Sequence, residues 1–230
     1  AIYADHTPSK RCTMNFSGVE LSGNEATSHG GVLAATDAQL QINGVSVTNN
    51  RSGNNGGAFY LCAVDMTGTG NNVFSGNKAV GHGGAIYAVY RTVSDKEKDG
   101  TVINLTGGSF SNNSAMGGGA ISIRSACEAT FDGTTFSGNT ASGFADKEDG
   151  DGEGGGAIYV GYGKLTAQNI TAIGNTSENY GGAIHLLDTD ATVTGSTFTT
   201  TCNDPGGYDI YAVGYSNTSF GVTDLIFNNL

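Results

Sequence analysis

A Gly-Gly pair followed by apolar residues recurs along the chain, and this repetition constrains the fold more than any other feature. The copies begin at Gly30, Gly56, Gly83, Gly118, Gly155 and Gly181, with a degenerate copy at Gly206. The intervals between them are 26, 27, 35, 37, 26 and 25 residues. A period of this size is typical of solenoids, in which each repeat buries its apolar face against the next.

A second motif precedes each Gly pair and consists of a large apolar residue, two small or polar residues and Asn. Its asparagines are Asn24, Asn50, Asn77, Asn113, Asn139 and Asn175. Around both motifs apolar residues alternate with polar ones, which predicts three short strands in each repeat. The sequence therefore predicts an all-β parallel β-helix of about eight coils, each of about 26 residues.

The recurring Asn and Gly residues are expected to have structural roles. Stacked Asn side chains can hydrogen-bond one another along a cross-β stack, so the six asparagines are predicted to form a buried ladder. The Gly pairs are predicted to form tight corners. They are not interpreted as phosphate-binding loops, because no helix follows them.

Two hydrophilic insertions, 91–100 and 144–154, account for the two long intervals. Solenoids tolerate insertions at turns, so residues 1–230 are interpreted as a single β-helix segment. Both ends of the sequence cut through a repeat, which suggests a piece of a longer solenoid. Its open coil ends would present unpaired strand edges, and self-association through them is expected.

The charge and the apolar content exclude several classes of protein. Ten Lys and Arg residues against 21 Asp and Glu residues give a net charge of −11, which argues against nucleic-acid binding. No apolar run reaches about 18 residues, so no membrane span is expected. The four cysteines, an even number, suggest an oxidising compartment. They fall in alternate coils, too far apart for column-wise disulfides, and are expected to be mostly free and buried: Cys12, Cys62, Cys127 and Cys202.

The alternation of the two motifs resembles a known repeat. Phe74-Ser75-Gly76-Asn77 is followed by Gly83-Gly84-Ala85-Ile86, and Phe136-Ser137-Gly138-Asn139 by Gly155-Gly156-Ala157-Ile158. This pattern resembles the repeat of the polymorphic outer membrane proteins, which are chlamydial autotransporter adhesins with relatives in other bacteria and some protists. The resemblance implies a secreted, extracellular passenger that is displayed on a cell surface and binds host receptors or assembles.

One column of aromatic residues is a candidate binding surface. If the third and fifth residues after each first Gly point inward, the fourth points outward. That position holds Tyr3, Tyr60, Tyr87, Tyr159, His185 and Tyr211. Exposed stacked rings suit a glycan or a protein partner. Alternatively, the rings only stabilise the neighbouring strands.

The second insertion is a candidate calcium site. Asp149, Asp151 and Glu153 alternate with Gly as in the first half of an EF-hand loop, but the twelfth position is Val160. A solvated charged loop is the alternative. No other cofactor is expected. In a eukaryotic source, Asn104, Asn112 and Asn217 would be the best glycosylation candidates.

Three functions remain open from the sequence. The first is a non-catalytic adhesin that binds a host-cell protein or glycan, and the second is a structural spacer or filament-forming surface protein. The third is a pectate-lyase-like, polysaccharide-active enzyme, which is remote because the candidate carboxylates are expected in different columns and coils: Glu128, Asp132, Asp188 and Asp190. The regular Thr-x-Thr column of an ice-binding surface is approached only around Thr192 and Thr194.

Overall fold

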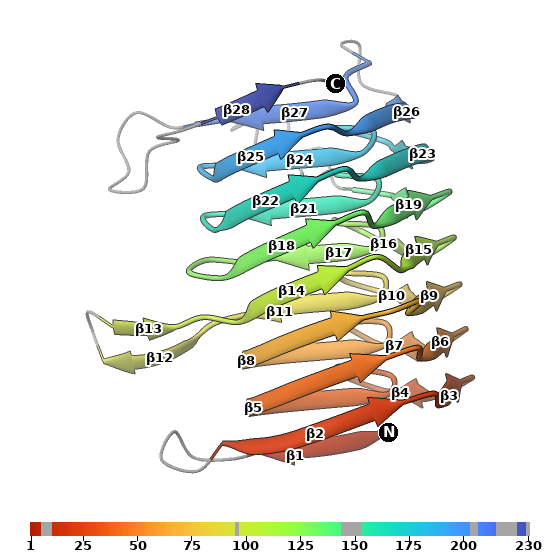
Figure 1. Cartoon of the computed structure of the whole chain (residues 1–230), viewed down its shortest axis with the longest axis vertical. Helices are drawn as coiled ribbons and strands as arrows, with labels where there is room; N and C mark the ends of the chain where they lie inside the picture. Colours follow the sequence, from red (N-terminus) through yellow and green to blue (C-terminus); the bar gives the residue numbers. More distant parts are fainter. Residues whose placement is uncertain (6–10, 95–96, 144–152, 203–206, 215–224, 229–230) are drawn as a thin grey trace.

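The chain forms a parallel β-helix, as the repeats predict. The computed structural model describes residues 1–5, 11–94, 97–143, 153–202, 207–214 and 225–228. The coils stack along the long axis of the molecule (Figure 1). All of the elements in this part of the chain are strands, and it contains no helix that could span a membrane.

The first strand of each coil follows the Gly pair. Eight such strands stack in parallel: β1 (Ile2–Asp5), β5 (Leu33–Asn43), β8 (Phe59–Thr69), β11 (Ile86–Val89), β17 (Ile121–Ile123), β21 (Ile158–Gly161), β24 (Ile184–Leu187) and β27 (Ile210–Val213). Their first residues are in register from Ile2 through Ile210.

The second strand of each coil forms a second stack on the same sheet. β5 and β8 belong to both stacks, since each continues around the corner between them, where Asp37 and Ala63 have positive φ angles of 52° and 55°. The other members are β2 (Cys12–Ser17), β14 (Val102–Thr106), β18 (Glu128–Asp132), β22 (Lys164–Gln168), β25 (Asp190–Thr194) and β28 (Leu225–Asn228).

A second sheet closes each coil. Its third-strand stack contains β3 (Glu20–Ser22), β6 (Ser46–Thr48), β9 (Val73–Ser75), β15 (Ser109–Ser111), β19 (Thr135–Ser137), β23 (Thr171–Ser177) and β26 (Thr197–Cys202). In addition to the three predicted strands, a two-residue strand follows the Asn corner in five coils: β4 (Glu25–Ala26), β7 (Arg51–Ser52), β10 (Lys78–Ala79), β16 (Ser114–Ala115) and β20 (Thr140–Ala141).

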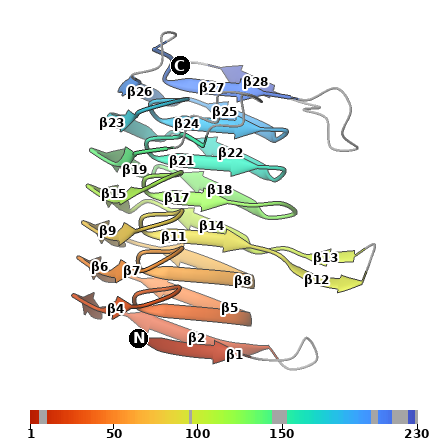
Figure 2. The same cartoon turned by 180° about the vertical axis from the view of Figure 1, so that it is seen from behind.

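The first insertion leaves the solenoid as an antiparallel hairpin of β12 (Arg91–Ser94) and β13 (Glu97–Asp99). It projects from one side of the stack, as the view from behind also shows (Figure 2). Most of the second insertion, 144–152, lies outside the described residues.

The interior is a column of apolar side chains that the alternating pattern directs inward. Phe74, Phe110 and Phe136 stack in successive coils with ring centroids 4.7 and 5.2 Å apart. Ala172 takes the next position in this register. Each of these side chains is at most 1% exposed, so the coils bury one another's apolar faces as a solenoid requires.

The six asparagines form a continuous hydrogen-bonded ladder at one corner. Oδ1 of Asn113 accepts hydrogen bonds from the backbone N and from Nδ2 of Asn77, at 2.9 and 3.0 Å. Its Nδ2 donates to Oδ1 of Asn139 and to the Phe74 carbonyl, at 2.9 and 3.0 Å. Asn113 is fully buried. The side chain therefore replaces the backbone hydrogen bonds that the corner interrupts.

The two glycines of each pair have different requirements. Gly83 has a φ of 65°, and a Cβ there would also collide with the carbonyl of Ile86. Gly84 has no such φ, but a Cβ would collide with the backbone of Gly119 in the next coil. The first glycine therefore permits the turn, and the second permits the close approach of neighbouring coils.

Candidate functional site

The aromatic residues identified in the sequence do lie in one column on the first stack. The column runs from Tyr3 through Tyr60, Tyr87 and Tyr159 to His185 and Tyr211, and Ala34 and Ser122 interrupt it. The rings of Tyr60 and Tyr87 stack with centroids 5.6 Å apart.

The expectation that this column is exposed is wrong for half of its members. Tyr3 is 75% exposed, but Tyr87, Tyr159 and His185 are 9%, 2% and 0% exposed. Tyr60 is half-buried, and burial raises the pKa of its phenol to about 12. A uniform aromatic stripe is therefore not available to a partner.

Arg124 covers two of the rings. Its guanidinium carbon lies 4.9 Å from the ring centroid of Tyr159 and 5.9 Å from that of Tyr87. Ser122 is paired in register between these two tyrosines and is fully buried. A cation over aromatic faces is a stabilising arrangement.

Glu153 fixes the end of the second insertion to this face. Its Oε1 lies 2.6 Å from Nη2 of Arg124, and its Oε2 lies 2.5 Å from Nδ1 of His82. The backbone N of Gly154 then donates to Nδ1 of His185 at 3.1 Å. We call Glu153, Arg124 and His82 the Glu153 anchor.

Contacts within the anchor shift the pKa values of Glu153 and Arg124. Burial alone would raise the pKa of Glu153, but hydrogen bonding and charge from His82 and Arg124 lower it below its ordinary value. Burial likewise lowers the pKa of Arg124, and the Glu153 carboxylate more than offsets this and raises it. The insertion is thus held by an ion pair that stays charged at neutral pH.

The predicted calcium ligands are not brought together in the described part of the chain. Asp149 and Asp151 lie outside the described residues, and both carboxylate oxygens of Glu153 contact other side chains. Within the described residues, no cluster of three or more His, Cys, Asp or Glu side chains could hold a metal ion.

The hairpin of the first insertion is tied to earlier coils by charge pairs. Arg91 contacts Asp37 at 3.1 Å and Asp99 at 3.4 Å. Arg11 contacts Asp65 at 2.6 Å and Asp99 at 3.0 Å. No sequence pattern predicts this network, because its members are up to 88 residues apart.

The outer face of the second stack carries two rows of polar side chains, which we call the polar rows. The first row is Asn15, Gln41, Thr67, Asn104, Thr130, Thr166 and Thr192. The second is Ser17, Asn43, Thr69, Thr106, Asp132, Gln168 and Thr194. All are exposed or half-buried. The alternation that directs apolar residues inward also places these polar residues outward.

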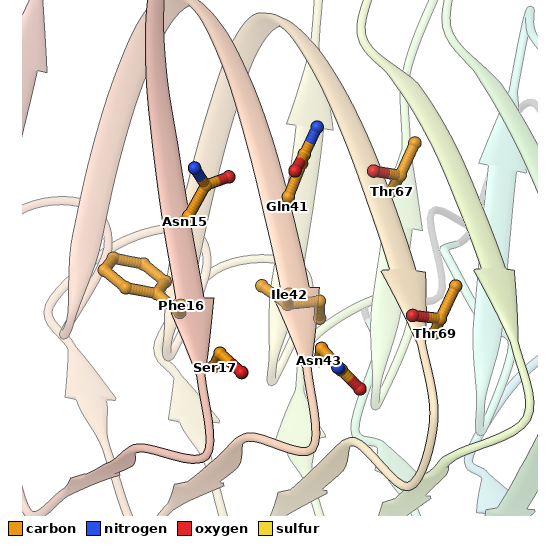
Figure 3. Close-up of a pocket in the computed structure, with 8 residues that line it drawn as sticks. All are labelled: Asn15, Phe16, Ser17, Gln41, Ile42, Asn43, Thr67 and Thr69. Atoms are coloured by element: carbon orange, nitrogen blue, oxygen red, sulfur yellow. The ribbon is translucent and has the colours of Figure 1, made fainter.

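A shallow hollow of about 380 Å³ lies where the rows cross the first three coils. Figure 3 shows Asn15, Gln41 and Thr67 side by side on neighbouring strands, with Ser17, Asn43 and Thr69 as a parallel set. The hollow is open, and hydroxyl and carboxamide groups line it together with Phe16 and Ile42. The hydroxyl and carboxamide groups can both donate and accept hydrogen bonds.

The candidate catalytic carboxylates are differently arranged from the expectation. Glu128 and Asp190 share one column, with Lys164 between them, so the prediction of separate columns is wrong for this pair. Two strand spacings, about 9.6 Å, separate their backbones. Asp132 lies in the polar rows, and Asp188 is buried at a corner with a φ of 44°.

Three of the four cysteines are free thiols, namely Cys12, Cys62 and Cys127. Cys127 is buried, and burial raises the pKa of its thiol to about 12. Cys12 and Cys62 are half-buried. The side chain of Cys202 and the sequon at Asn217 lie outside what the structure describes, whereas Asn104 and Asn112 are exposed.

The fold and its repeated corners define the chain as a parallel β-helix solenoid, and the comparison with protein families agrees. The Chlamydia polymorphic membrane protein (Chlamydia_PMP) repeat matches residues 73–89, 107–124 and 133–161. Each match begins at or just before a third strand, crosses the Asn ladder and a Gly pair, and ends at or just after a first strand. Three stretches of the chain are therefore similar to the repeat of this family, which confirms the resemblance and supports a cell-surface protein in general terms. No curated protein and no solved structure matches the chain.

Proposed function

We propose that this chain is the extracellular, non-catalytic part of a cell-surface adhesin. The observation that carries the proposal is the pair of polar rows, which extend over seven coils and take no part in the core. For folding alone, these positions need only side chains that tolerate exposure to water. A long, regular and open face on a surface-displayed rod is suited to contact with a partner.

The aromatic column has a smaller part in this proposal. Tyr3 is open, and Tyr60 and Tyr211 are half-buried, so these three remain candidates for contact with a host-cell protein or glycan. The covered members, Tyr87, Tyr159 and His185, are assigned to holding the second insertion. A role of 149–153 in calcium binding and association through coil ends remain secondary proposals.

A structural spacer is the second candidate function. The continuous Asn ladder and the Phe stack favour it, because both give length and stiffness without a ligand. The enzyme alternative has weaker support, since the candidate carboxylates are spread over a column, a row and a buried corner.

Binding of the purified chain to cultured cells tests the proposal. The row variant carries Gln41→Ala, Thr67→Ala and Asn104→Ala, three neighbours in the first polar row. The control variant carries Ser22→Ala, Thr48→Ala and Ser75→Ala, three neighbours on the other sheet. Saturable binding that is weakened in the row variant and kept in the control supports the adhesin. Equal binding by both variants would place the contact surface outside the polar rows, and no binding by the unaltered chain would favour the spacer.

A further inference from the structure

The chemical uniformity of the polar rows points to one class of ligand. Of the fourteen side chains, Asp132 is the single charged one, and the remaining thirteen carry a hydroxyl or a carboxamide. The neighbouring outward row, by contrast, contains Asp65, Glu128, Lys164 and Asp190. In a chain of net charge −11, the two rows form a strip of low charge along the solenoid.

The hydrogen-bonding groups of this strip are free to bind a ligand. Among the described residues, Asp132 is the one member of the rows whose side chain has a hydrogen-bond partner, and that partner is Asn169. The strip is also open along part of its edge. Glycines such as Gly18, Gly44 and Gly133 follow the second row, and a Cβ at any of them would meet no atom within 4 Å.

The strip is periodic in the direction of the long axis. Neighbouring strands are about 4.8 Å apart, and the two rows are about 6.6 Å apart, twice the rise per residue. A ligand that satisfies such a surface along its length must itself repeat at a similar interval. An extended polysaccharide does so, because its sugar rings present hydroxyl groups at a comparable spacing.

The charge and the apolar content of the strip favour this ligand over others. Protein interfaces concentrate their binding energy in buried aromatic and Arg anchors, and the rows contain neither. An anionic polymer would be repelled by the acidic chain, and no Lys or Arg in the rows would attract it. Hydroxyl and carboxamide groups are matched by the hydroxyl groups of a neutral sugar.

We propose that the polar rows bind an uncharged polysaccharide that lies along the axis of the β-helix. This inference rests on the proposed adhesin function and names the class of its receptor. The hollow between Asn15, Gln41 and Thr67 is the place where the first sugar rings are seated (Figure 3).

Pull-down of the full chain with insoluble neutral polymers tests the proposal. The probes are cellulose, a mannan and a neutral β-1,3-glucan, with alginate beads as the anionic comparison. We expect saturable binding to at least one neutral polymer that does not change between low and high salt, because no ion pairs contribute. We expect the row variant to bind about a hundredfold more weakly, since it loses three hydrogen bonds and each contributes a factor of about five. The control variant should bind as the unaltered chain does.

The outcomes separate this inference from the adhesin function. The inference is overturned if none of the neutral polymers binds, if alginate binds in a salt-sensitive manner, or if the row and control variants bind neutral polymers equally. If protease treatment of cells abolishes cell binding and neutral polymers do not bind, the receptor is a protein and the adhesin function stands. If the unaltered chain binds neither cells nor polymers, both proposals fail. Equal melting curves of the three proteins show that lost binding is not lost folding.

Discussion

The Glu153 carboxylate lies 2.6 Å from the guanidinium of Arg124, although 29 positions separate the two residues in the sequence. Arg124 in turn lies over the rings of Tyr87 and Tyr159. The ion-paired Arg124 thus covers Tyr87 and Tyr159, which the sequence alone predicts to be exposed to solvent. It also fixes the end of the second insertion at the solenoid surface.

Loss of the Glu153 charge should destabilise the protein at neutral pH. We expect Glu153→Gln to lower the free energy of unfolding by about 2 kcal/mol, because Arg124 then stays largely buried beside a neutral group. Denaturant titration at pH 7 measures the change. An effect below about 0.5 kcal/mol, as for an ordinary surface substitution, would contradict it.

The same variant has a predicted dependence on pH. The folded-state pKa of Glu153 is lowered, so its ion pair contributes stability above the ordinary carboxyl pKa of about 4.3. That contribution is lost as the pH falls through the lower folded-state pKa. The difference in unfolding free energy between the unaltered chain and Glu153→Gln should therefore shrink below about pH 4. A difference that stays constant from pH 7 to pH 3 would exclude the ion pair as its source.

Removal of the Arg124 side chain should expose the covered tyrosines. We expect Arg124→Ala to allow nitration of Tyr159 and Tyr87, because its guanidinium lies over both rings. Tyr3, which is 75% exposed, should be nitrated equally in both proteins and is the internal control. Peptide mass spectrometry after a short treatment reads the sites. Unchanged protection of Tyr159 would show that other groups cover it.

An alanine in the middle of the Asn ladder should be strongly destabilising. Asn113→Ala leaves the backbone N of Asn77 and the carbonyl of Phe74 without their side-chain partners in a buried corner. Each such group costs about 1–3 kcal/mol, so we expect a loss of about 3 kcal/mol or more. The exposed Asn104→Ala is the matched control and should change the unfolding free energy by about 0.5 kcal/mol at most. Equal thermal shifts for the two variants would argue against the structural role of the ladder.

Alanine substitutions at two glycines with the same φ angle should distinguish the cost of backbone strain from the cost of a steric collision. Gly83 and Gly133 both have a φ of 65°, but a Cβ would collide with the Ile86 carbonyl only at Gly83. We expect Gly133→Ala to cost about 1–2 kcal/mol from the left-handed conformation alone. Gly83→Ala should cost clearly more and lower the yield of folded protein. Similar melting temperatures for both variants would show that the corner can relax.

The cysteines should differ in reactivity. Burial raises the pKa of Cys127 to about 12, so almost none of it is thiolate at pH 8. We expect a maleimide reagent to label the half-buried Cys12 in the folded protein and to label Cys127 only after denaturation. Mass spectrometry of the labelled peptides measures this. Rapid labelling of Cys127 at pH 8 without denaturant would contradict its burial.

The sequence by itself determined the architecture. Asn and Gly-Gly recur at one interval, and in a solenoid equivalent residues of successive coils lie side by side. Asn77 and Asn113 are such a pair, joined by a side-chain hydrogen bond. Alternation within each repeat then decides which residues enter the core, such as Phe74 and Phe110. These properties are local and periodic, so they can be read without coordinates.

The tertiary structure decided what is exposed on the finished surface. The partners of Arg124 and Arg91 come from insertions that have no counterpart in other coils, so no periodic rule could place them. Alternation predicts that Tyr159 points outward. It cannot predict that Glu153 forms an ion pair with Arg124 while the Arg124 guanidinium lies over the Tyr159 ring. The polar rows likewise depend on the register of seven neighbouring strands. The turns between these strands differ in length, so the sequence alone does not show which residues are aligned. Contacts between distant, non-repeated segments depend on the folded path of the chain, and only the structure supplies that path.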